Sequence, residues 1–190
     1  MPTPIAFTDL NVMNQALTGS IGGDIITDLE TDDSTKALIM RENYEAVSEF
    51  AQTKTAWRFN TTKVALNKLS GVPLNRWGAA WQLPPDLLKV LTTWPISSYE
   101  IQGNKLLTNN TAELHLDYQR KIEEALWPSW FLRYVVARLV LRTVKGITGK
   151  KADQDMQNEA SDAEDDALFQ DAQQQPNQTI LSSAFVDVRR

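Results

Sequence analysis

The sequence predicts a mainly α protein, a helix bundle with an inserted small antiparallel β platform and an extended C-terminal tail. Two observations predict the body of this fold. Apolar residues recur at helical spacing before residue 57 and after residue 121, whereas between Tyr99 and Tyr118 they alternate with polar residues. A glutamine-rich linker then precedes a terminal stretch that belongs to no predicted element, which predicts the tail.

The length of 190 residues is enough for one domain with a buried core. We therefore expect a helical domain over residues 1–174, with the β insertion at about 74–118. Residues 175–190 are expected to form an extended C-terminal arm.

Two helices are predicted before the platform. Thr8 and Ser34 are suitable N-caps, because their hydroxyls can accept from the free amides of a first turn. The first helix should end near Gly22. Its apolar stripe is Leu10, Met13 and Leu17, and that of the second helix is Ala37, Met40, Tyr44, Val47 and Ala51, widened by Phe50.

The platform is predicted from turn residues and a period of two. Pro84-Pro85 makes a stiff turn, after which Asp86 can cap a short turn over 87–91. Gly103-Asn104 is a strong signal for a two-residue hairpin. The alternating apolar positions of its strands and of a further strand are Tyr99, Ile101, Leu114, Leu116 and Tyr118.

Helix is expected to resume over residues 121–126. Pro128 suits the first turn of a central helix over 130–147, which is apolar around most of its circumference. The polar stripe of this helix is Arg138, Arg142 and Lys145. A last helix from Lys151 has a narrow seam of small residues that includes Ala160, Ala163 and Ala167.

The charge of the chain is uneven. The net charge is −5, which argues against a general nucleic-acid binder. Eight acids and no base lie between Ala152 and Gln174, so the rest of the chain carries +3. These acids are interpreted as a solvated helix face, or as a face that repels DNA phosphates in a channel. Arginines interrupt the longest apolar run, Trp127 to Val144, so we expect no membrane segment there.

Catalysis is not expected. His115 is the single histidine, and the chain has no cysteine, so a zinc site would need an unusual ligand set. The glycines at Gly146 and Gly149 close a predicted helix, whereas a phosphate-binding loop opens one. We therefore expect no catalytic residue, metal or cofactor.

Two groups of residues are candidates for contacts between subunits. Trp77, Trp81 and Trp94 cluster in a segment with too few strands to bury them all within one chain, and such aromatics are favoured at interfaces. The alanine seam of the last helix is the second group, because small side chains let a neighbouring backbone approach closely while burying little apolar area.

The order of these parts resembles the head-to-tail adaptors of short-tailed phages, the tail tubular protein A type. The resemblance covers nearly the whole chain and rests on four features. These are the aromatic pair Trp57 and Phe59, the Leu-Pro-Pro-Asp turn at 83–86, the hairpin at Gly103-Asn104, and the aromatic helix from Trp127.

The resemblance implies a structural virion protein at the head-tail junction, made in the host cytoplasm. Such a protein forms a ring of twelve subunits that joins the portal protein to the tail nozzle protein and lets DNA pass without reading its sequence. The terminal segment reaches the portal, and the residues assigned to portal binding are Ile180, Leu181, Phe185, Val186, Arg189 and Arg190. The hairpin faces the tail, and the residues assigned to tail binding are Tyr99, Gly103, Asn104 and Lys105.

Two alternative functions stay open at this point. Head-completion (neck) proteins of siphophages have a related helical bundle. An acidic DNA mimic or regulatory module would instead present the acidic face of residues 152–174 to a basic partner, and would be a monomer or dimer.

Overall fold

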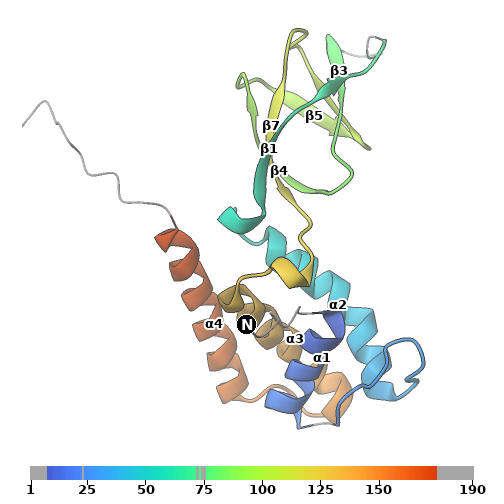
Figure 1. Cartoon of the computed structure of the whole chain (residues 1–190), viewed down its shortest axis with the longest axis vertical. Helices are drawn as coiled ribbons and strands as arrows, with labels where there is room; N and C mark the ends of the chain where they lie inside the picture. The colour runs from blue at the N-terminus through green and yellow to red at the C-terminus, as the bar shows by residue number, and fades with distance from the viewer. Residues whose placement is uncertain (1–7, 23, 72, 74–75, 175–190) are drawn as a thin grey trace, which may run out of the picture.

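A computed structural model describes residues 8–22, 24–71, 73 and 76–174 of the chain. In these residues a helical body lies at one end of the molecule and a β unit at the other (Figure 1). The fold is therefore mixed, with four α-helices and two small antiparallel sheets among the described residues. The extended tail predicted for 175–190 lies outside the described residues.

Four helices form the helical body. Their bounds are α1 (Asp9–Ala16), α2 (Thr35–Thr53), α3 (Ser129–Thr148) and α4 (Gln154–Gln173). The predicted caps are confirmed: the Thr8 hydroxyl accepts from the Asn11 amide, and the Ser34 hydroxyl from that of Ala37. A π-helical turn, Leu17–Ile21, extends α1 to Gly22, whose φ of 75° is the left-handed conformation that glycine favours at a helix end.

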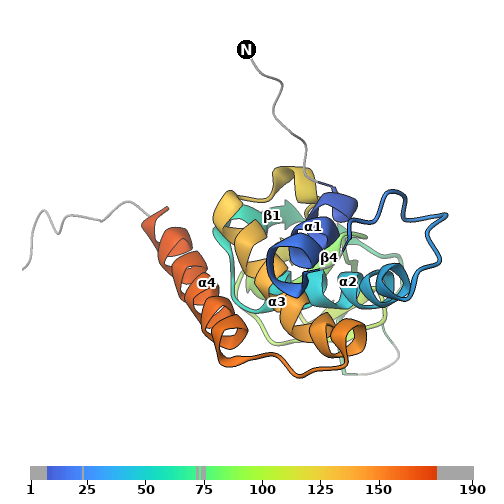
Figure 2. The ribbon, with the colours of Figure 1, turned by 90° about the horizontal axis from the view of Figure 1, so that it is seen from below.

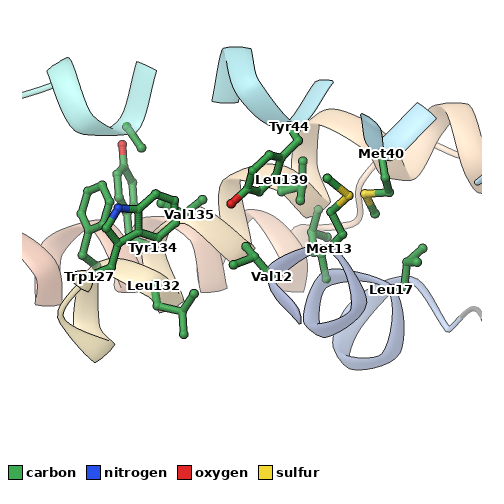
Figure 3. Close-up of a cluster of buried hydrophobic side chains, with 14 of the residues drawn as sticks. Val12, Met13, Leu17, Met40, Tyr44, Trp127, Leu132, Tyr134, Val135 and Leu139 are labelled. Atoms are coloured by element: carbon green, nitrogen blue, oxygen red, sulfur yellow. The ribbon is translucent and has the colours of Figure 1, made fainter. Parts of the chain in front are cut away.

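The core of the helical body forms where α1 and α2 pack on α3. Met13 of α1 lies beside Met40 of α2, and Tyr44 of α2 lies beside Leu139 of α3 (Figure 3). At the other end of this core, Trp57 is fully buried and lies within 6.5 Å, centroid to centroid, of four further aromatic rings: Phe59, Trp130, Phe131 and Tyr134. Seen from below, α4 and α2 lie on opposite sides of α3 (Figure 2).

Seven strands form the β unit. Three make the sheet β1-β7-β4 and four make the sheet β2-β3-β6-β5, all with antiparallel pairing. The bounds are β1 (Thr61–Ala65), β2 (Asn67–Lys68), β3 (Ala79–Gln82), β4 (Leu87–Trp94), β5 (Tyr99–Gln102), β6 (Lys105–Thr108) and β7 (His115–Arg120). The two sheets enclose a second core, separate from that of the helices, which includes Leu66, Trp81, Leu106, Leu116 and Tyr118.

A buried amide junction, formed by Gln52, Asn60 and Gln119, joins the β unit to the helical body. The Gln119 amide on β7 donates to the main-chain oxygens of Gln52 (2.9 Å) and Thr55 (2.6 Å) and to Asn60 Oδ1 (3.1 Å). Gln52 Oε1 in turn accepts from the Ile122 amide at 2.9 Å. Each of the three junction side chains is at most 1% exposed, so these bonds hold the β unit in one orientation on the helices.

Two local predictions are wrong. The short turn expected over 87–91 is strand β4, and Asp86 does not cap a helix but accepts a hydrogen bond from the Tyr118 hydroxyl at 3.1 Å. The helix expected over 121–126 is only the 3₁₀ turn Glu124–Leu126. In both places pairing or packing with distant residues overrides the local pattern.

The strands also begin earlier than residue 74. β1 starts at Thr61, because its residues pair with β7 at least fifty positions later, as Thr61 does with Gln119. The helices α1 to α4, the hairpin and the strand that ends the platform are otherwise where the sequence predicts them.

Candidate functional site

The hairpin assigned to tail binding forms as predicted. Gln102 pairs with Lys105 across the two-residue turn Gly103-Asn104. Gly103 has a φ of 58° and Asn104 does not have a positive φ, which is the pattern of a type II′ turn with glycine at its first central position. Lys105 is exposed, and Tyr99 is partly exposed at the far end of β5.

The β unit exposes four large apolar side chains between the end of β4 and β5, which we name the apolar edge: Trp94, Ile96, Tyr99 and Ile101. Trp94 and Ile96 are 65% and 79% exposed, and β5 is an outer strand of its sheet. Trp94 pairs with His115 at the start of β7, whereas β7 reaches the helices at Gln119, so Trp94 lies at the end of the sheet farther from the helical body. A clustered set of large exposed apolar side chains is typical of a protein contact surface.

A hollow of about 310 Å³ opens beside Trp94 on the outer face of sheet β1-β7-β4. The side chains that line it are Lys63, Thr92, Thr93, Trp94, Ile96, His115 and Asp117. Lys63 and Asp117 form an ion pair at 3.2 Å beside it, and His115 Nε2 lies 3.1 Å from Glu113 Oε1. His115 is therefore a surface strand residue that engages a neighbouring carboxylate. Within the described residues no group of three or more His, Asp or Glu side chains could hold a metal ion.

The three tryptophans assigned to subunit contacts differ in exposure. Trp81 is 2% exposed in the core of the β unit and donates to the Asn110 carbonyl. Trp77 is buried on the other face of the same sheet and donates to Glu100 Oε2 at 2.8 Å. These two residues are covered within the chain, which removes the argument that they need a neighbouring subunit. Trp94 remains available for a contact.

The alanine seam is also covered within the chain. Ala160, Ala163 and Ala167 are at most 2% exposed. Ala160 and Ala163 pack against Ala137 of α3, and Ala167 joins the core of the helical body. A seam of methyl groups buries little apolar area, so polar contacts must add to the attachment of α4.

Ion pairs supply those contacts. Glu164 lies 2.7 Å from Lys54 and is also paired with Arg138. Asp171 accepts from the Arg58 amide at 2.8 Å and pairs with its guanidinium at 3.2 Å. Burial acts to raise the pKa of Glu164, but the hydrogen bonds and charges of its two cationic partners outweigh burial and hold this pKa below its ordinary value.

Four of the eight acids between residues 152 and 174 thus bind a partner within the chain. Asp153 caps the helix through the Met156 amide at 2.8 Å, and Asp166 lies 3.8 Å from Arg133. The acids that neither cap the helix nor make an ion pair within the described part of the chain are exposed: Asp155, Glu159, Asp162 and Asp165. The acidic face is therefore narrower than the sequence indicates.

The sequence does not predict the exposure of three large apolar side chains, those of Ile96, Phe169 and Phe50. Ile96 follows β4 with no periodic signal, and Phe169 lies on a helix that reads as acidic. Phe50 was assigned to the buried stripe of α2 but is 54% exposed. Its position next to Ala51, at the border of the apolar stripe, is the one sequence signal for this exposure. The six residues assigned to portal binding lie outside the described residues.

The scan against family models gives no match for this chain, and the search of curated proteins finds none that is significantly similar. Among the described residues, no helix is long and apolar enough to cross a membrane.

Proposed function

We propose that this chain is a structural virion protein, a head-to-tail adaptor whose ring connects the portal to the tail nozzle around an axial channel for DNA. The observation that carries the proposal is the apolar edge. It exposes Trp94 and Ile96 on a β unit that the buried amide junction holds in one orientation on the helices. A small protein that must join two different partners needs such a second, firmly placed contact surface.

Three parts of the chain have a role in this proposal. The apolar edge and the hairpin turn at Gly103-Asn104 bind the next tail component, with aromatic side chains as anchors. The arm 179–190 carries five large apolar residues and two terminal arginines, and binds the portal. The unpaired acids of α4 act as a negative surface toward DNA, which lowers its adhesion to the assembly.

Reconstitution with the portal protein of the same virus tests this function. We expect a closed ring below the portal in electron micrographs. Deletion of residues 179–190 should weaken portal binding severely and leave the thermal midpoint of the chain nearly unchanged, because the two cores that the structure describes are built from residues 10–167. A monodisperse portal complex without a ring, or undiminished portal binding by the truncated chain, would contradict the proposal.

The exposed carboxylates of α4 favour one further candidate, an acidic module that imitates DNA. Asp155, Asp162 and Asp165 lie along one helix and make no ion pair within the described residues. Such a module would bind a basic DNA-binding protein in competition with duplex DNA, and it would do so without a portal. Loss of that competition in a variant with the three aspartates changed to asparagine would support it.

A further inference from the structure

The helical body has an unfilled groove between α2 and α3. It has a volume of about 430 Å³ and is lined by Ala46, Val47, Phe50, Arg138, Leu141 and Arg142. The α2 wall is apolar, and 54% of Phe50 is exposed there. The α3 side carries two guanidinium groups. A groove of this composition fits a helix that combines carboxylates with a large apolar side chain.

Within the described residues the positive charge of the groove is only partly neutralised. Glu164 is shared by Lys54 and Arg138, so a single carboxylate serves two cations. The Nε of Arg138 is buried without a hydrogen-bond partner. Arg142 donates to the neutral Asn43 side chain at 2.9 Å and makes no ion pair within the described residues. Lys145, on the next turn of the same α3 face, is exposed and likewise makes none there.

The outward face of α4 has the complementary pattern. Asp155, Asn158, Asp162, Asp165 and Phe169 follow one another at intervals of three and four residues, which places them in one straight stripe. We name these five residues the outer stripe. It lies opposite the alanine seam, and its members are exposed, with Phe169 59% accessible. Its three carboxylates make no ion pair in the described structure.

We propose that the outer stripe of α4 from one copy of the chain docks in the α2/α3 groove of the next copy. In the register we assign, Asp162 faces Arg142, Asp165 faces Arg138, and Phe169 packs on Phe50. The axial spacing fits this register. At about 1.5 Å per residue, Asp162 and Asp165 are separated by about 4.5 Å along α4, and Arg142 and Arg138 by about 6 Å along α3.

The direction of the docked helix agrees with cyclic assembly. Glu164 contacts Arg138 and Asp166 contacts Arg133, so α4 runs antiparallel to α3 within one chain. The assigned register requires the neighbour's α4 to run antiparallel to the same α3. Rotation about an axis parallel to the helices leaves the direction of α4 the same in the neighbouring copy. The contact joins two different faces of the chain, the α4 stripe and the α2/α3 groove, which is the kind of contact that a ring requires. The inference thus rests on the proposed ring and specifies the contact that builds it.

Single-cysteine variants test the contact directly, because the chain has no cysteine of its own. Ala46→Cys places a thiol in the groove and Asn158→Cys places one on the outer stripe, both at exposed positions. The two variants are mixed, treated with a short bis-maleimide, and analysed by mass spectrometry, both free and assembled on the portal. We expect a dimer that contains one chain of each variant. The matched control is Ala46→Cys mixed with Ser98→Cys, an exposed position on the β unit.

Charge reversal adds a second measurement. Arg142→Glu introduced into the Ala46→Cys chain should lower the crosslinked fraction at least about tenfold, because a carboxylate would then face Asp162. Lys105→Glu, at an exposed lysine on the hairpin, is the matched control and should leave the fraction unchanged.

The outcomes separate this contact from the proposed function. A ring on the portal with no Ala46–Asn158 crosslink above the Ser98 control would overturn the contact and leave the adaptor function standing. Absence of both the ring and the crosslink would overturn both. A crosslink that Arg142→Glu does not reduce would overturn the assigned register.

Discussion

Replacement of Gln119 by leucine tests whether the buried amide junction holds the β unit on the helices. Gln119 is fully buried on β7, and leucine has a similar volume but no amide. The change removes the three hydrogen bonds that the Gln119 amide donates to the main chain of Gln52 and Thr55 and to Asn60 Oδ1.

The size of the expected loss of stability depends on which hydrogen bonds each acceptor retains in the variant. The Gln52 oxygen retains the bond from Asn60 Nδ2 at 3.0 Å, and the Thr55 oxygen retains that from the Trp57 amide at 2.9 Å. Asn60 Oδ1 alone is left buried without a donor, which costs about 1–3 kcal/mol. The two weakened acceptors add to this cost, whereas removal of Gln119 Oε1, which has no partner, offsets part of it. We therefore expect a net loss of about 2 kcal/mol in the free energy of unfolding.

Urea unfolding followed by tryptophan fluorescence measures this loss, since Trp57 lies beside the junction. A loss of about 2 kcal/mol should lower the thermal midpoint by about 4–8 °C in a chain of this size. Gln102→Leu makes the same chemical change at an exposed strand position and should change stability by less than about 0.5 kcal/mol. If Gln119→Leu is no less stable than Gln102→Leu, the amide junction does not hold the two units together.

Three further predictions concern α4 and the hairpin. The folded pKa of Glu164 lies below its ordinary 4.5, so its ion pairs stabilise the fold above that pH, and this stabilisation is lost as the pH falls below it. In the variant Glu164→Gln the free energy of unfolding should therefore fall less steeply with acid, as measured by unfolding curves between about pH 3 and 6. Ala163→Leu should overpack the α3–α4 contact and lower the free energy of unfolding by about 1–3 kcal/mol, whereas leucine at the exposed Ser161 should not. Gly103→Val should distort the turn, because valine resists its φ of 58°, and should leave filled heads without tails while portal binding persists; normal tail attachment would argue against the tail-binding role.

The sequence alone determined the parts that depend on short-range chemistry. Thr8 and Ser34 cap their helices as predicted, and Gly103-Asn104 closes the hairpin, because a cap or a tight turn is decided by neighbouring residues. The long apolar stretch of α3 likewise left no alternative to a central, buried helix.

Burial of side chains at the borders of these elements was decided by tertiary structure. Trp81 is enclosed because a second sheet packs over it, and Phe50 is exposed because no helix in the described part of the chain covers that side of α2. The sequence pattern predicts that the acids of α4 form one charged face. Glu164 and Asp171 instead form ion pairs with cations that lie far away in the sequence, Lys54 and Arg58. The local pattern contains no information on such partners.

Strand pairing shows most clearly which features depend on the local sequence and which depend on the tertiary structure. The polar stretch at Thr61–Ala65 becomes a strand because β7 offers it a free edge, and residues 87–91 become β4 because the opposite edge of β7 is also open. A strand is stabilised by hydrogen bonds to a partner strand, whereas a helix makes its hydrogen bonds within its own segment. For that reason the sequence determined helices α1 to α4, the hairpin and strand β7, and only the tertiary structure decided the other strands and the amide junction that joins the β unit to the helices.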